Sequence, residues 1–121
     1  MSSVLLVDDE VEICILLSSI LRKEGYDTKY VHSLLEARRY IENNEFAIVI
    51  LDLNLPDGLG YQLIDPIRKK YNSVKIIVIS AYDGESLEAI RRGSDAFISK
   101  PFTKKTITDL LRKLNLPIKN S

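Results

Sequence analysis

The sequence predicts an α/β domain in which five βα units build one doubly wound, five-stranded parallel sheet flanked by helices. Short apolar runs such as residues 47–51 recur without polar interruption, which is typical of strands buried on both faces. Segments with apolar residues three and four positions apart lie between these runs, as in amphipathic helices. The length of 121 residues suits one domain with its own core.

The expected strands follow from the apolar runs. They cover residues 4–7, 26–31, 47–51, 75–80 and 96–99. The second of them is more polar than the others, as expected for a strand nearer the sheet edge. We expect residues 1–121 to form a single domain, with 115–121 as a frayed tail or the start of a linker.

The expected helices have apolar residues on one face and capping residues at their ends. Ser33 and Glu36 form a capping box for the second helix, and Thr103 can cap the last. Gly93 is the expected C-cap of the short fourth helix. Pro66 lies inside the third helix, where its missing backbone donor should kink or loosen the first turns. The inward-facing residues are expected to be Ile13, Leu17, Ile20 and Leu21, then Leu34, Ala37, Tyr40 and Ile41, then Leu63, Ile64, Ile67 and Tyr71, then Leu87 and Ile90, and finally Ile107, Leu110, Leu111 and Leu114.

Composition excludes several classes of protein. Seventeen basic and 17 acidic residues balance, so no overall positive field favours nucleic acid or a membrane surface. The single cysteine, Cys14, excludes an intramolecular disulfide framework and suits a reducing compartment. No apolar run reaches the ~18 residues that span a bilayer, and the N-terminus does not resemble a signal peptide. We therefore expect a cytoplasmic domain that contacts neither nucleic acid nor membrane directly.

Polar or charged residues follow four of the five expected strands. Asp8 and Asp9 follow the first strand, Asp52 the third, Ser80 the fourth and Lys100 the fifth. The carboxyl ends of parallel strands meet at one edge of the sheet, where ligands bind in open α/β folds. These side chains are therefore expected to converge on one site.

The types of residue in this set indicate phosphoryl chemistry. Neighbouring carboxylates repel one another unless a cation neutralises them, and oxygen ligands without His or Cys suit Mg²⁺. A carboxylate can attack phosphorus to give an aspartyl phosphate, here at Asp52. The ammonium of Lys100 and the hydroxyl of Ser80 are suited to stabilise the transferring group. Together these residues predict a site that accepts a phosphoryl group.

The chain resembles the response-regulator receiver domain of two-component signalling over essentially its whole length. The resemblance rests on five stretches in the order and spacing of the family, at residues 4–9, 51–60, 79–81, 93–96 and 100–102. It implies a flavodoxin-like (βα)5 fold and a phosphorylation switch rather than an enzyme, apart from its own phosphoryl transfer and slow autodephosphorylation. The implied phosphodonor is a sensor histidine kinase, a histidine phosphotransfer protein or a small molecule, and the implied cofactor is Mg²⁺ (or Mn²⁺).

The same resemblance implies the metal ligands. Asp9 and Asp52 would bind the ion directly, together with the backbone carbonyl of Asn54. Asp8 would act largely through water.

The resemblance also implies how the phosphoryl group is held. The Ser80 hydroxyl, the Ala81 backbone and the Lys100 ammonium would bind it. Ser80 and Phe97 would form the switch pair, in which the aromatic ring turns inward as the hydroxyl moves. The bond between Lys100 and Pro101 resembles the cis peptide of the family, which orients the lysine.

The predicted output is a change of surface. Phosphorylation would alter the face made by the fourth helix, the fifth strand and the fifth helix, which a downstream effector or a second copy would read. Tyr82, two residues after Ser80, is expected to overhang the phosphoryl group and prolong its lifetime.

Three other functions fit parts of the pattern. An aspartate-nucleophile phosphatase of the haloacid dehalogenase family shares the chemistry, but its second acid corresponds to Asn54 here, and its nucleophile lies on the first strand. A flavodoxin-like cofactor carrier would need a phosphate loop after the first strand, where Asp8 and Asp9 would repel phosphate. A degenerate receiver that only binds partners would not need all five site positions.

Overall fold

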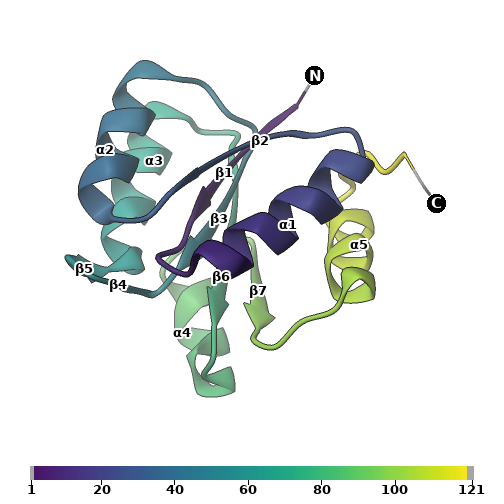
Figure 1. Ribbon diagram of the computed structural model, residues 1–121. Helices are drawn as coiled ribbons and strands as arrows, with labels where there is room; N and C mark the ends of the chain where they lie inside the picture. Colours follow the sequence, from purple (N-terminus) through teal and green to yellow (C-terminus); the bar gives the residue numbers. More distant parts are fainter. Residues whose placement is uncertain (1, 120–121) are drawn as a thin grey trace.

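A computed structural model describes residues 2–119 and places five parallel strands in one sheet (Figure 1). The strand order is β2-β1-β3-β6-β7, so the chain starts inside the sheet and winds to both edges. The strands are β1 (Ser3–Val7), β2 (Asp27–Val31), β3 (Ile48–Asp52), β6 (Lys75–Ser80) and β7 (Ala96–Ser99). The predicted fold class is confirmed, and the polar strand β2 lies at an edge as expected.

Helices cover both faces of this sheet. Strand residues alternate in direction, so Leu5 and Val49 join one core cluster while Leu6 and Ile50 join the other. The first cluster packs against α2 and α3, and the second against α1 and α5, on opposite sides of the sheet in Figure 1. The helices are α1 (Val11–Lys23), α2 (Leu34–Asn43), α3 (Ile64–Lys70), α4 (Ser86–Arg91) and α5 (Lys104–Lys113).

The capping predictions hold at two helices. The Ser33 side chain accepts a hydrogen bond from the Glu36 backbone at the start of α2. The Glu36 carboxylate accepts from His32 N–H, so it reaches one residue beyond the N-cap. Thr103 caps α5 in a capping box with Thr106.

The segment between β3 and α3 contains structure that the sequence pattern did not predict. A small antiparallel pair, β4 (Asn54–Leu55) and β5 (Gly58–Leu59), is followed by a 3-10 helix at Gly60–Leu63. α3 therefore starts only at Ile64, which places Pro66 in its first turn. Backbone N–H groups in a first turn have no partner inside the helix, so proline is tolerated there without breaking it.

The expected apolar stripe of α4 was wrong. Leu87 is 85% exposed and Ile90 is 48% exposed, whereas the buried residue of this helix is Ala89. A six-residue helix presents only one or two side chains to the sheet, and a small residue allows it to pack closely. The predicted C-cap Gly93 does follow the helix and has a positive φ of 109°.

The C-terminal segment also differs from the expected frayed tail. Leu116 and Ile118 are partly buried against the core cluster of α1 and α5. The Tyr26 hydroxyl donates to the Pro117 carbonyl at 2.7 Å, and the Lys119 N–H donates to Glu24 at 3.1 Å. Residues 120–121, the end of the expected tail, lie outside the described part of the chain. No helix within residues 2–119 has the length and apolar composition to cross a membrane.

Candidate functional site

Four carboxylates meet at the carboxyl edge of the sheet. Val7 and Leu51 are register partners in β1 and β3, so Asp8 and Asp52, the next residues, end adjacent strands side by side. One carboxylate oxygen from each of Asp8, Asp9, Glu10 and Asp52 lies within 4.8 Å of the others. Asp8 and Asp52 are buried, whereas Asp9 and Glu10 are exposed. The predicted convergence of strand ends is therefore present.

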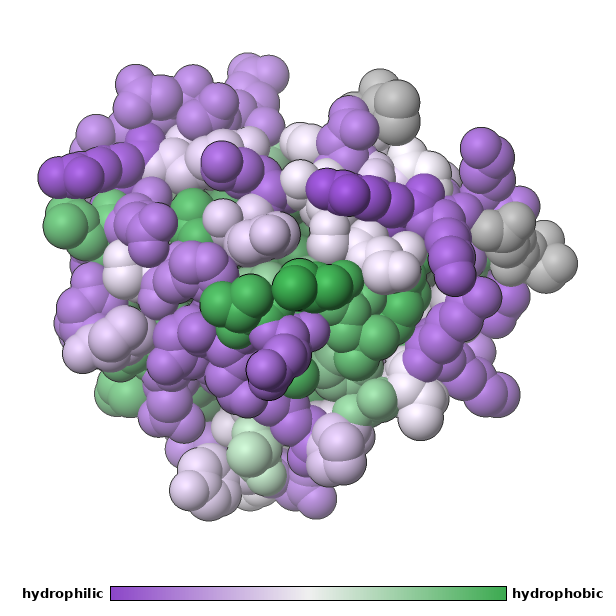
Figure 2. Space-filling view, viewed as in Figure 1, coloured by the Kyte–Doolittle hydropathy of each residue, from purple (hydrophilic) through white to green (hydrophobic). Residues whose placement is uncertain are grey.

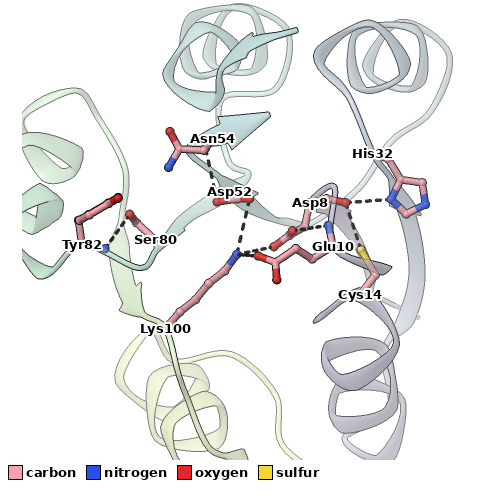
Figure 3. A network of polar contacts seen from close by, with 9 residues as sticks. All are labelled: Asp8, Glu10, Cys14, His32, Asp52, Asn54, Ser80, Tyr82 and Lys100. Carbon is pink, nitrogen blue, oxygen red and sulfur yellow. Dashed lines mark hydrogen bonds and ion pairs between the residues drawn. The ribbon is translucent and has the colours of Figure 1, made fainter. Parts of the chain in front are cut away.

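Lys100 reaches this cluster from the end of β7 (Figure 3). Its Nζ lies 2.9 Å from Glu10 Oε1, 3.2 Å from Asp8 Oδ2 and 3.6 Å from Asp52 Oδ2. The peptide bond between Lys100 and Pro101 is cis. One ammonium thus faces three carboxylates, which leaves a net negative charge.

Burial and this excess negative charge shift the pKa values of Asp52 and Lys100. Burial and the Asp8 carboxylate raise the pKa of Asp52 from 3.8 to about 6, against the opposing effect of Lys100. Burial by itself lowers the pKa of Lys100, but the hydrogen bond to Glu10 and the charges of Asp52 and Asp8 raise it overall. The site is thus arranged to receive a further positive charge, which would favour the ionised form of Asp52.

Hydrogen bonds between side chains and backbone groups fix the turn that carries Asp8 and Asp9. Asp8 Oδ1 accepts from the Glu10 N–H at 2.9 Å, and the Asp8 carbonyl lies 2.9 Å from His32 Nδ1. The thiol of Cys14 donates to the same carbonyl at 3.4 Å. Burial raises the pKa of Cys14 to about 12, so this thiol stays neutral and acts as a core residue.

The exposed side of the cluster opens into a cavity of about 350 Å³. The lining residues are Asp9, Glu10, Asp52, Asn54, Ala81 and Lys100. The donor set contains only oxygen atoms, and the buried Asp8 Oδ2 has no hydrogen bond, although it faces Lys100. Hard oxygen ligands of this kind fit Mg²⁺, so the residues present suit the cofactor that the sequence predicts.

The remaining predicted residues, Ser80, Tyr82 and Phe97, do not line this cavity. Ser80 is buried at the end of β6, and its Oγ accepts from the Tyr82 N–H at 3.1 Å. Ser80 and Tyr82 line a separate cavity of about 160 Å³ next to Asn54, and Tyr82 is 67% exposed. Phe97 is half-buried on β7 and packs against the cluster that contains Ala89 of α4. Ser80 therefore lies next to the acidic cavity without lining it, whereas Phe97 packs toward α4.

Sequence reasoning missed one member of the cluster. Glu10 holds the shortest ion pair to Lys100, yet the sequence analysis assigned it no role in the site. Its position directly after Asp9, in a run of three acids, is the signal that could have identified it.

Comparison with known sequences supports the same family as the geometry of the site. The family model described as the response regulator receiver domain matches residues 4–112. The chain is 31% identical over 106 residues to the uncharacterised transcriptional regulatory protein YclJ of Bacillus subtilis, covering 86% of this chain and 46% of that protein. It is 32% identical over 100 residues to the regulatory protein VanRc of Enterococcus gallinarum, covering 82% and 43%. The chain thus spans less than half the length of these two relatives.

Solved structures are similar over most of the chain. The response regulator TrrA of Thermotoga maritima, in complex with Mg²⁺ and BeF, has a TM-score of 0.84 at 31% identity, covering 94% of this chain and 99% of that one. The non-phosphorylated HemR receiver domain of Leptospira biflexa has a TM-score of 0.83 at 30% identity and covers both chains completely. The chain belongs to the response regulator receiver domain family, the aspartate-phosphorylated signalling domains of two-component systems.

Proposed function

We propose that Asp52 is the residue of this chain that accepts the phosphoryl group. The observation that carries the proposal is the convergence of four carboxylates and Lys100 at the ends of three parallel strands. In the transfer, an Asp52 oxygen forms a bond to phosphorus as the bond from phosphorus to the donor imidazole nitrogen breaks. The electron pair of that bond stays on the imidazole.

We propose Mg²⁺ (or Mn²⁺) as the ion of the acidic site. Asp9 and Asp52 would hold it directly with the Asn54 carbonyl, and Asp8 through water. When bound, the ion supplies positive charge to the phosphoryl oxygens. Asp9 and Asn54 line the same cavity as Asp52, which supports this assignment.

The other site residues would stabilise the charge that remains on the phosphoryl group. Lys100 lies 3.6 Å from Asp52, close enough to follow a phosphoryl oxygen bound there. Ala81, whose backbone N–H would donate to the phosphoryl group, lines the same cavity. Ser80 would reach it by giving up its hydrogen bond with Tyr82, and Phe97 would then turn inward.

The phosphodonor would dock beside this cavity, on α1. Val11, Ile15 and Leu16 are all about half exposed, and Figure 2 shows a hydrophobic patch over this helix surrounded by hydrophilic residues. A contiguous exposed apolar patch of this kind marks an interaction surface. We propose a sensor histidine kinase or a histidine phosphotransfer protein as this partner, since transfer brings the donor histidine within reach of Asp52.

We further propose that residues 1–121 form one receiver domain that holds its phosphate as a signal. Asn54 stands where an aspartate-nucleophile phosphatase has its second acid, so no carboxyl group is placed there to activate water. Autodephosphorylation would accordingly be slow.

Intact-mass measurement tests the proposal. With Mg²⁺ and the small phosphodonor acetyl phosphate, the wild-type chain should gain one phosphoryl group, and Asp52→Asn should gain none. Rapid repeated turnover of the donor would instead indicate a phosphatase. No adduct on the folded wild-type chain would indicate a receiver that only binds partners.

A further inference from the structure

The turn that follows the phosphoacceptor strand is attached to a distant helix through Asp57. This residue lies between β4 and β5, and its two carboxylate oxygens accept from the N–H groups of Leu34 at 2.8 Å and Leu35 at 3.0 Å. Ser33 Oγ accepts from the next N–H, that of Glu36, at 3.1 Å. Three free donors at the start of α2 are thus satisfied, two of them by a residue more than 20 positions away.

This contact is a close fit between the hairpin and α2. Gly58 has a φ of +147°, and a Cβ there would lie 2.7 Å from Leu34 Cδ1. Leu55, from the other strand of the hairpin, is buried in the same core cluster as Leu34. The hydrogen bonds from the Leu34 and Leu35 N–H groups favour the charged form of Asp57 and so lower the pKa of its carboxyl group. The tip of the hairpin therefore cannot shift without breaking charged hydrogen bonds.

The other end of the same segment is attached to the phosphoacceptor strand. Gly60 N–H donates to the Leu53 carbonyl at 2.8 Å. A Cβ on Gly60 would lie only 2.1 Å from the Asp52 carbonyl oxygen. Only glycine therefore allows the backbone at position 60 to pack this closely against the phosphoacceptor strand. The hairpin between these anchors begins with Asn54, whose N–H lies 3.5 Å from Asp52 Oδ1.

We propose that Asp57 is a positioning residue that fixes the Asn54 backbone for Mg²⁺, and so makes the site selective for Mg²⁺ over Ca²⁺. The inference rests on the proposed metal site. Mg²⁺ requires near-ideal octahedral ligands at about 2.0–2.1 Å, whereas Ca²⁺ accepts flexible geometry at about 2.3–2.6 Å. A small displacement of one backbone ligand therefore weakens the site for Mg²⁺ more than for Ca²⁺.

The test is a pair of NMR titrations of the full chain, with MgCl2 and with CaCl2, following backbone amide shifts. Asp57→Ala should lower the Mg²⁺ affinity by about tenfold, the lower limit for losing a residue that orients a metal ligand. The Ca²⁺ affinity should fall less. Asp57→Asn keeps one acceptor oxygen and should give an intermediate loss, and it serves as the measured variant if the alanine variant does not fold.

Ser33→Ala is the matched control, because it removes the remaining cap of α2 without touching the hairpin. It should leave both affinities unchanged. Equal losses for Mg²⁺ and Ca²⁺, an equal loss in Ser33→Ala, or unchanged affinity in the Asp57 variants would each overturn the inference. Absence of Mg²⁺ binding to the wild-type chain would contradict the proposed metal site itself, and the inference with it.

Discussion

At the scale of single residues, the Asp52 carboxylate destabilises the fold that presents it. Its pKa is about 6 in the folded chain and close to 3.8 when unfolded, so the folded state binds more protons between these values. Stability therefore falls as pH rises through this window, and the full cost is present at neutral pH. Asp52→Asn should remove the charge and raise the free energy of unfolding at pH 7.5 by about 1–3 kcal/mol.

Urea unfolding at several pH values checks this prediction. The difference between Asp52→Asn and wild type should shrink as pH is lowered and be mostly lost by pH 4, because wild-type Asp52 is then protonated when folded. Lys100 keeps Asp8 and Glu10 as partners in the variant, so it does not become a buried unpaired charge. A difference that did not change with pH would contradict this account.

The same acidic cluster should make the stability depend on Mg²⁺. An ion that binds only the folded chain raises its apparent stability by mass action, so millimolar Mg²⁺ should raise the melting temperature at pH 7.5. Protons compete with the ion for the Asp52 carboxylate, whose pKa is raised to about 6, so the increase should be much smaller at pH 5. Calorimetric scans with and without Mg²⁺ measure it. A shift of equal size at both pH values would indicate binding elsewhere.

The side chain of Tyr82 is expected to control how long Asp52 stays phosphorylated. Its side chain lines the cavity that also contains Ser80 and Asn54, beside the acidic site. In the phosphorylated state we expect it to cover the phosphoryl group and exclude water. Tyr82→Ala should then shorten the phosphorylated lifetime severalfold, as followed by intact mass after donor removal, whereas Tyr82→Phe should preserve it. An unchanged lifetime in the alanine variant would contradict the hypothesis.

At the scale of elements, prediction from the sequence depended on how much of each element is buried. β1, β3 and β6 have apolar residues facing both helix layers, so their runs identified them. The prediction for α4 was wrong because this helix contacts the sheet through the small residue Ala89, while its large apolar residue Leu87 faces solvent. The pair of β4 and β5 was missed because two-residue strands carry no periodic pattern.

The segment before α4 is connected to the hairpin region by Tyr61. Its hydroxyl donates to Glu85 at 2.6 Å, and the Arg92 guanidinium lies 4.5 Å from its ring centroid. Tyr61→Phe keeps the ring contact and loses the hydrogen bond to a charged group, which contributes about 1–2 kcal/mol at a half-buried site. Amide hydrogen exchange at residues 82–91 should become faster.

Tyr71→Phe is the control for this prediction. Its hydroxyl donates to the Asn44 carbonyl at 2.8 Å, on the side of the molecule that carries α2. It should lower global stability without a selective increase of exchange at residues 82–91. Equal effects of the two variants on this segment would contradict a specific role for Tyr61.

At the scale of the whole molecule, the site residues that could be predicted from the sequence are those placed by the ends of the sheet strands. Parallel strands bring their carboxyl ends to one edge, so Asp8, Asp52 and Lys100 were expected to meet, and they do. The contributions of Glu10 and Asp57 depend on how two loops lie against distant residues, Lys100 and the start of α2. Such contacts over more than 20 residues leave no local pattern in the sequence.

The predicted output surface is made by α4, β7 and α5. A cavity of about 270 Å³ lies between α4 and α5 and is lined in part by Ile90, Phe97 and Leu110. Leu87, also on α4, is exposed to solvent. Inward movement of Phe97 would change this cavity directly. We therefore expect phosphorylation to promote self-association through this face, with the exposed Leu87 buried between two copies.

Leu87→Lys tests that expectation. Losing a leucine that would contribute about 1.5–3 kcal/mol on burial should weaken the phosphorylated dimer at least tenfold. Monomer stability and phosphorylation at Asp52 should not change, because Leu87 is 85% exposed. Sedimentation velocity with and without phosphodonor measures this. Leu35→Lys is the matched control, since Leu35 is an exposed leucine on α2, outside the face made by α4, β7 and α5. A phosphorylated wild-type chain that stays monomeric would contradict self-association and leave an effector protein as the reader of this face.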